Sequence, residues 1–183
     1  VLNRLIKMEK IKEQWLFKMA KNQLGIIAAV ANNRVIGYNG NLPWPRIPED
    51  MKRFVKLTLN HPVIMGRVTF DSIVKRLGHP LERRGSIVVS RAIHTVKQAT
   101  ACESIDAAIR FAFSIDSIAY VIGGQQIYEQ TIDKADFLEI TAINGDYKGD
   151  SFFPEVKART WGLVSIEKHE GNPAYSFERY ERR

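Results

Sequence analysis

The stretch Pro62-Val63-Ile64-Met65-Gly66-Arg67-Val68-Thr69-Phe70 opens with an apolar run that ends in a glycine and a cation. A short continuous apolar run between turn residues predicts a strand buried on both faces, here over residues 62–67. The following pattern predicts a helix over residues 68–77. Strand, glycine and helix in direct succession are typical of a parallel α/β sheet.

The same alternation continues on both sides of this unit. Further strands are predicted over residues 24–31, 86–91, 118–122 and 136–143, the first two of them buried. Further helices are predicted over residues 51–59, 104–113 and 125–134, the second with Ser104 as its cap. Residues 161–168 and 175–181 flank Gly171-Asn172-Pro173 and predict an antiparallel hairpin. We expect one α/β domain over residues 23–183, with a central mostly parallel sheet, an antiparallel C-terminal hairpin and helices on both faces.

The charge of the 183-residue chain, formally +7, is unevenly distributed. Residues 1–22 hold six basic and two acidic residues, +4 of the total, so the remaining chain carries only +3. This mildly basic body lacks an interleaved aromatic pattern, which argues against a nucleic-acid-binding domain. Residues 1–22 are interpreted as an extension outside the fold, either upstream or vector-derived sequence or, alternatively, a surface-docking segment.

Composition also limits compartment and cofactor type. The single cysteine, Cys102, fits a reducing cytoplasm. No apolar stretch reaches the length of a transmembrane helix, so no membrane contact is expected. The four histidines, at positions 61, 79, 94 and 169, lack the paired spacing of metal ligands, so no metal is expected. We expect a cytoplasmic protein, and we further expect a monomer.

An acid, Asp50, stands among apolar residues where the helix over 51–59 begins. Pro48 suits a first helical turn, and Glu49 and Asp50 complement the helix dipole, so a helix-start role alone would account for Asp50. Phe54 and Leu57 follow at i+4 and i+7 on one face. Three cations are expected to point elsewhere: Lys52, Arg53 and Lys56. If the apolar face is buried, desolvation raises the pKa of Asp50 toward the range of proton chemistry, and the local pattern leaves both roles open.

Three predicted strands end in residues that suit phosphate groups: Gly66-Arg67-Val68-Thr69, Ser90-Arg91 and Gly123-Gly124-Gln125-Gln126. Open parallel sheets bind ligands beyond the carboxyl ends of their strands, where helix N-termini and arginines accept phosphate. Each turn alone is a weak signal, because strand–glycine–helix turns are common. Three in one domain predict a dinucleotide, and the Ser-Arg pair predicts its phosphorylated form.

Several motifs, in this order, resemble dihydrofolate reductase of the bacterial chromosomal type. They are Ile27-Ala28-Ala29-Val30, Val35-Ile36-Gly37, Leu42-Pro43-Trp44, Pro48-x-Asp50, Pro62-Val63-Ile64-Met65-Gly66-Arg67-x-Thr69-Phe70, Val121-Ile122-Gly123-Gly124, Gly149-Asp150-x-x-Phe153-Pro154 and Glu181-Arg182-Arg183. The match runs from Leu24 to the C-terminus, and consecutive motifs in register are far more specific than any one of them.

The resemblance implies reduction of 7,8-dihydrofolate to tetrahydrofolate by hydride transfer from NADPH. Asp50 would hold the 2-amino group and a ring nitrogen of the pterin and favour protonation of N5 before hydride reaches C6. Trp44 would help position a water, and Leu42 would belong to a mobile lid over residues 37–42. These three are the expected catalytic residues.

The resemblance also implies the remaining site residues. Substrate would contact Asp50 together with Ile27, Ala29, Met51, Phe54, Leu81, Arg84, Ile122, Tyr128 and Thr141. Ile27 and Ile122 would contribute backbone carbonyls, and Arg84 would pair with the α-carboxylate of the glutamate tail, with Arg83 as an adjacent competitor. NADPH would contact Ala29, Ile36, Gly37, Asn41, Leu42, Gly66, Arg67, Val68, Thr69, Ser90, Arg91, Ile122, Gly123, Gly124, Gln125, Gln126, Ile127 and Tyr128. Antifolates such as trimethoprim or methotrexate would compete with substrate.

Two departures and one rival qualify these expectations. Val68 occupies a position that is often polar or basic in the family, so the 2′-phosphate would depend more on Arg67 and Arg91. Pro45-Arg46 makes the interval from Trp44 to Asp50 one residue longer than in many bacterial relatives. A pyrimidine reductase of riboflavin synthesis shares the architecture and NADPH, but Asp50, Trp44 and Arg84 together favour folate.

Overall fold

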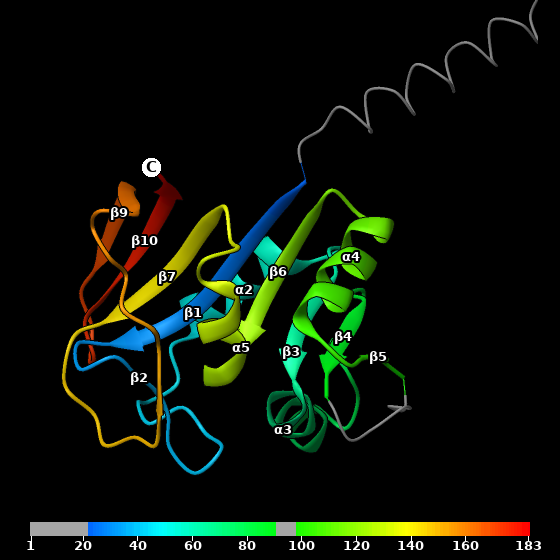
Figure 1. Cartoon of the computed structure of the whole chain (residues 1–183). Helices are drawn as coiled ribbons and strands as arrows, with labels where there is room; N and C mark the ends of the chain where they lie inside the picture. Colours follow the sequence, from blue (N-terminus) through cyan, green and yellow to red (C-terminus); the bar gives the residue numbers. More distant parts are fainter. Residues whose placement is uncertain (1–21, 91–97) are drawn as a thin grey trace, which may run out of the picture.

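β1 (Gln23–Ala31) lies inside the sheet because nearly every residue of its middle is apolar and can be buried on either side. It pairs in parallel with β6 (Ile118–Gly123) and with β7 (Phe137–Ile143). β3 (Val63–Gly66) and β4 (Ser86–Val89) extend the sheet beyond β6, and β5 (Thr100–Cys102) ends it. The computed structural model describes residues 22–90 and 98–183, and Figure 1 shows this sheet across the molecule.

The last two strands close the other edge. β10 (Tyr175–Arg182) runs antiparallel to β7, and β9 (Trp161–His169) runs antiparallel to β10. The order β5-β4-β3-β6-β1-β7-β10-β9 confirms the predicted mostly parallel sheet with its antiparallel C-terminal hairpin (Figure 1). A separate two-stranded sheet pairs β2 (Val35–Gly37) with β8 (Ser151–Phe152).

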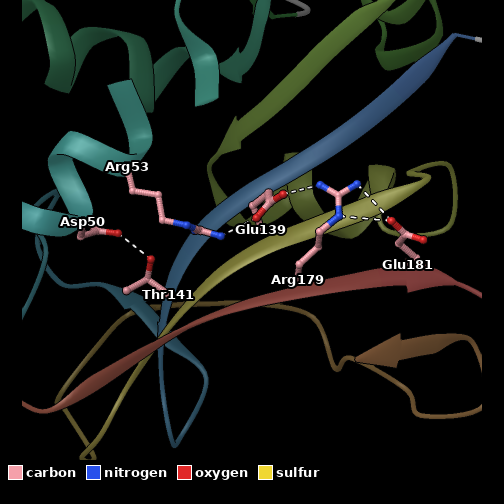
Figure 2. Close-up of polar contacts among 6 residues, drawn as sticks. All are labelled: Asp50, Arg53, Glu139, Thr141, Arg179 and Glu181. Carbon is pink, nitrogen blue, oxygen red and sulfur yellow. Dashed lines mark hydrogen bonds and ion pairs between the residues drawn. The ribbon is translucent and has the colours of Figure 1, made fainter. Parts of the chain in front are cut away.

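Helices cover both faces of the sheet because successive strand side chains point to opposite sides. On one side, Ile26, Ile64 and Leu138 pack with α4 (Ile105–Ile115) and α5 (Gln125–Thr131). On the other side, Ile27 and Met65 pack with α2 (Pro48–Thr58) and α3 (Arg67–Leu77). The second face is the one on which α2 places Asp50 (Figure 2).

Helix boundaries follow the predicted signals with small shifts. Pro48 occupies the first turn of α2, and Ser104 Oγ accepts a hydrogen bond of 3.2 Å from Ala107 N at the start of α4. Gly78 ends α3 at φ 82°, a left-handed conformation that favours glycine. α5 ends at Thr131, three residues earlier than predicted, and β4 ends at Val89 rather than at residue 91.

Three short strands were not predicted: β2, β5 and β8. β2 runs into the start of the expected lid over residues 37–42, and only pairing with β8, more than a hundred residues away in sequence, makes it a strand. No helix in the described part of the chain is long and apolar enough to cross a membrane. Residues 1–21 and Arg91 lie outside the described residues. The expectations for the extension over residues 1–22 and for Arg91 therefore fall there, apart from residue 22.

Candidate active site

Asp50 is buried at the start of α2, with 9 % of its surface exposed. Its Oδ1 accepts a hydrogen bond of 2.6 Å from Thr141 Oγ1 on β7, and Thr141 is itself 1 % exposed (Figure 2). A buried carboxylate needs such a donor, because burial without one is costly. The structure therefore brings together the two residues that were predicted to bind one end of the pterin.

Burial raises the pKa of Asp50 above its ordinary value. The hydrogen bond from Thr141 and the positive charge of Arg53 oppose this effect without cancelling it. A raised pKa in a buried carboxyl group is typical of residues that take part in proton chemistry.

The surroundings of Asp50 are mostly apolar. Ile27 belongs to the buried cluster between the sheet and the helices α2 and α3, and Phe54, Leu81 and Ile122 pack against that cluster. Met51, the next residue of α2, is half-buried. These side chains form the kind of low-polarity wall that a flat heterocycle can contact.

Tyr128, on α5, approaches β1 from the other face of the sheet. Its hydroxyl donates a hydrogen bond of 2.9 Å to the carbonyl oxygen of Ile27. The pKa of Tyr128 is raised, mainly by burial and further by the negative charge of Asp50. The hydroxyl therefore stays protonated. A carbonyl oxygen has two lone pairs and can accept from a second donor.

Trp44 is buried, with 6 % exposure, in a separate cluster near the carboxyl end of β1, against which Ala29 packs. Its ring meets Tyr147 edge to face, with centroids 5.5 Å apart. Leu42, two residues earlier, is 40 % exposed. Trp44 thus fixes the end of the loop while Leu42 remains accessible.

The two adjacent arginines, Arg83 and Arg84, differ in their surroundings. Arg84 is half-buried, with its guanidinium carbon 6.0 Å from the ring centroid of Phe54, and its Nε donates to Glu82 O at 3.1 Å. Burial lowers the pKa of Arg84, with Arg83 contributing in the same direction and Glu82 opposing, but a guanidinium stays charged at neutral pH. Arg83 is exposed, with φ at 56°. Only Arg84 of the two lies over the aromatic wall.

Two glycine-led helix starts lie side by side at the carboxyl ends of β3 and β6, which are paired strands. A Cβ added to Gly124 would lie 3.3 Å from Thr69 Oγ1, and one added to Gly66 would lie 3.1 Å from the Ile127 side chain. Gly123 has φ at 133°, which side chains rarely adopt. The glycines let the two helix starts approach each other closely, and backbone N–H groups at helix starts favour anionic ligands; we call this pair of helix starts the cradle.

Several expected cofactor residues already have protein partners. Arg67 forms an ion pair with Asp71 one turn along α3, Nε to Oδ1 2.7 Å. Gln125 Oε1 accepts from Phe152 N at 2.8 Å, and its Nε2 donates to Glu129, so this side chain links α5 to β8. Val68 is 77 % exposed, and Ile36 packs against the cluster under α4 and α5. Ser90 follows β4 and donates its backbone N–H to Cys102 O.

The expected lid, residues 37–42, is held from two sides. Asp150 Oδ2 accepts from Asn39 N at 2.8 Å, and Asp150 N donates to Gly37 O at 3.0 Å. From α3, Ser72 Oγ donates to Gly40 O at 3.1 Å. Neither Asp150 nor Ser72 was given a role by the sequence, although Asp150 lies in a motif that matched the family.

One sequence expectation about α2 is wrong. Arg53 was expected to point away from the face of Asp50, but it is half-buried and pairs with Glu139 on β7 (Figure 2). An i+3 residue lies close to the same face of a helix, and Glu139 offers a buried anion there. An acid within the otherwise apolar run Phe137-Leu138-Glu139-Ile140 was the signal that could have revealed this pair.

Fold and site together define an α/β protein with two glycine-led helix starts at the carboxyl edge of a parallel sheet and one buried acid on its apolar face. The chain belongs to the dihydrofolate reductase family, which it matches over residues 23–182.

Individual relatives agree with this assignment. The chain is 38 % identical over 165 residues to dihydrofolate reductase HdrB of Haloferax volcanii, covering 86 % of this chain and 82 % of that protein. It is 38 % identical over 164 residues to the dihydrofolate reductase of Bacillus subtilis, covering 87 % and 95 %. A dihydrofolate reductase from Enterococcus faecalis, solved in complex with NADP(H) and RAB-propyl, superposes with a TM-score of 0.81 at 27 % identity, covering 89 % of this chain and 98 % of that one.

Proposed function

We propose that this chain reduces 7,8-dihydrofolate to 5,6,7,8-tetrahydrofolate, with NADPH as the hydride donor. The observation that carries the proposal is the buried pair Asp50–Thr141, placed beside the two glycine-led helix starts of α3 and α5. A carboxylate and a dinucleotide cradle at one sheet edge are what a hydride transfer to a protonated heterocycle requires.

Asp50 is proposed to hold the pterin. Among the described residues Thr141 bonds only Oδ1 of this carboxylate, and its two oxygens together can accept the 2-amino group and a ring N–H. Positive charge on the pterin is stabilised by this anion, so a proton is retained at N5. The imine carbon C6 then accepts hydride more readily.

The rest of the substrate is proposed to lie along α2. Ile27, Ala29, Met51, Phe54, Leu81, Ile122 and Tyr128 would contact the pterin and benzoyl rings. Arg84, aligned over Phe54, would bind the α-carboxylate of the glutamate tail through two N–H groups. The burial of Arg84 and the exposure of Arg83 favour Arg84 for this role.

The cradle at Gly66, Gly123 and Gly124 fits the phosphates of NADPH, which supplies the hydride when bound. Arg67 and Thr69 on α3, and Ser90 after β4, would hold its phosphates, and Arg67 would exchange Asp71 for phosphate. Residues 37–42, including Asn41 and Leu42, would exclude water from the reacting carbon, and Trp44 would position the one water needed near N5.

The test is NADPH oxidation followed at 340 nm with dihydrofolate, with NADH as the comparison donor and the pyrimidine of the riboflavin pathway as the comparison substrate. Dihydrofolate with NADPH should give by far the highest kcat/KM. Turnover of the pyrimidine alone would refute the proposal.

We further propose that the protein acts in the cytoplasm as a monomer, and that trimethoprim or methotrexate competes with dihydrofolate. Light scattering on the peak eluted from a size-exclusion column tests the monomeric state, and the inhibition pattern against dihydrofolate tests the competition. A dimer mass would contradict the first, and inhibition uncompetitive with dihydrofolate would contradict the second.

A further inference from the structure

Two contacts side by side join α2 to β7 below the pterin site. Asp50 and Arg53 are three residues apart on α2, and Thr141 and Glu139 are two residues apart on β7, so each pair shares a face. Thr141 Oγ1 donates to Asp50 Oδ1, and Arg53 Nη2 donates to Glu139 Oε2 (Figure 2). The helix is therefore docked by one hydrogen bond to an acid and one ion pair.

Glu139 is held by two arginines at once. Its Oε1 accepts from Arg179 Nη1 on β10 at 2.5 Å, while Oε2 takes Arg53. Arg179 continues to Glu181 through Nη2 at 3.2 Å. The Glu139 side chain is 5 % exposed, so these charges are weakly screened by water. The row Arg53, Glu139, Arg179, Glu181 alternates in sign from the site to the surface (Figure 2).

Arg53 lies between two carboxylates. Its positive charge lowers the pKa of Asp50, against the dominant effect of burial, and both Glu139 and Asp50 act on Arg53 in turn. Its Nη1 is buried and has no hydrogen-bond partner among the described residues. Arg53 could therefore pair directly with Asp50 if Glu139 did not hold it.

Other polar groups around this pair come from four further strands and helices. The charge of Asp50 contributes to the pKa shifts of Tyr128 on α5 and Tyr175 on β10. The charges of Arg53, Glu139 and Arg179 contribute to the pKa shift of Tyr120 on β6. Burial raises the pKa of all three, so they are neutral at pH 7. Glu49 on α2 acts on Tyr175, and Glu167 on β9 acts on both Arg53 and Tyr175. Arg53 is the one cation that acts directly on Asp50 among the described residues.

We propose that Glu139 is a positioning residue for Asp50. By holding Arg53 on β7, it keeps the guanidinium close enough to favour the ionised acid, yet away from the carboxylate oxygens that bind the pterin. This inference rests on the proposed reductase function. It gives Glu139 and Arg53 a role in which neither residue contacts the substrate.

The test compares Glu139→Gln with Arg53→Gln, using the pH dependence of kcat and the KM for dihydrofolate. Under the proposed function, turnover should fall as pH rises because the proton at the Asp50–pterin pair is lost. Glu139→Gln removes a negative charge and releases Arg53, so the midpoint of this fall should move to lower pH, and KM should rise roughly tenfold as Arg53 occupies Asp50. Arg53→Gln removes a positive charge, so the midpoint should move to higher pH. A merely structural role would move both midpoints the same way or neither.

The double variant Arg53→Gln/Glu139→Gln isolates the release of Arg53. Without the guanidinium, removing Glu139 should no longer raise KM, so the tenfold effect should shrink to less than about twofold. The double variant also avoids a lone buried charge, so it provides a result even if Glu139→Gln alone fails to fold. Glu181→Gln is the matched control at the exposed end of the row, and it should leave KM and the midpoint unchanged.

Besides a lack of any effect in the variants, two results would overturn the inference. One is a set of midpoints that shift in the same direction in the two single variants. The other is a rise in KM on removing Glu139 that persists in the Arg53→Gln background. If the unmodified protein has no activity with dihydrofolate, the proposed function fails instead; if it is active and the variants match it, only the role of Glu139 fails.

Discussion

At the residue scale, replacing the carboxyl group of Asp50 distinguishes a role at the helix start from a role in the chemistry. Asp50→Asn should retain the fold, because Asn Oδ1 can still accept from Thr141, but it cannot stabilise a protonated pterin. We expect kcat at pH 7 to fall by about 10²-fold or more, with partial recovery at acid pH, where some substrate is already protonated at N5. Steady-state rates from pH 5 to 8 measure both effects.

The neighbouring acid supplies the control for this substitution. Glu49 lies in the same first turn of α2 but is exposed. Glu49→Gln therefore removes one negative charge near the same helix N-terminus without changing the buried site around Asp50. It should leave kcat within about twofold. If Asp50→Asn also kept its turnover at pH 7, the chemical role of Asp50 would be lost and the helix-start interpretation would remain.

A second residue-scale prediction concerns the glutamate tail of the substrate. Arg84→Ala should raise the KM for dihydrofolate roughly tenfold or more, because two charge-assisted hydrogen bonds to a carboxylate are lost, with little change in the KM for NADPH. Arg83→Ala is the matched control, since the two arginines are adjacent but only Arg84 lies over Phe54. If only the KM for NADPH changed, Arg84 would bind the cofactor and not the glutamate tail of the substrate.

At the element scale, sequence periodicity identified every long strand and helix. The apolar runs at β1, β3 and β6 are buried on both faces, and this local property was enough to predict them. β2 and β8 are three and two residues long and exist only through their pairing, which local sequence does not encode. Arg53 was misplaced for a similar reason, since Glu139 comes from an element 86 residues away.

The candidate site was predictable to a similar extent. Asp50 and Thr141 were expected in one site and lie 2.6 Å apart, whereas the lid contacts of Asp150 and Ser72 had no local signal. Both of these contacts join a side chain to a backbone atom of the lid, and a motif gives no information about which backbone atom a side chain will meet.

The lid therefore yields the prediction at this scale. Asp150→Ala removes the acceptor for Asn39 N, which should leave residues 37–42 open for a larger fraction of the time. We expect the single-turnover rate of hydride transfer to fall several-fold while the KM of dihydrofolate changes little. Ser151→Ala is the control: Ser151 Oγ bonds the other oxygen of Asp150, so its loss leaves the lid bond intact. Equal rates in the two variants would show that this bond does not hold the lid.

At the scale of the whole molecule, catalysis and stability make opposite demands on the same buried acid. Burial raises the pKa of Asp50 in the folded protein above the ordinary value of 3.8. Between those two pKa values the folded chain binds more protons than the unfolded chain, so the free energy of unfolding falls as pH rises through that window. Above the window the full cost of an ionised buried acid remains. The protein retains this cost because an uncharged side chain could not hold the proton on its substrate.

Asp50→Asn should therefore be more stable than the parent at pH 7, although it is less active. We expect roughly 1 kcal/mol, or about 2–4 °C in Tm for a chain of this size. Arg53 is not left without a partner by this change, because Glu139 still holds it. The advantage should narrow as pH falls from 8 toward 4, since protonation removes the charge from the parent as well. Thermal melts of both proteins across this range, with Glu49→Gln as the exposed control, measure the difference. A Tm advantage that is absent at pH 7, or that does not depend on pH, would mean that burial of the Asp50 charge costs the fold nothing.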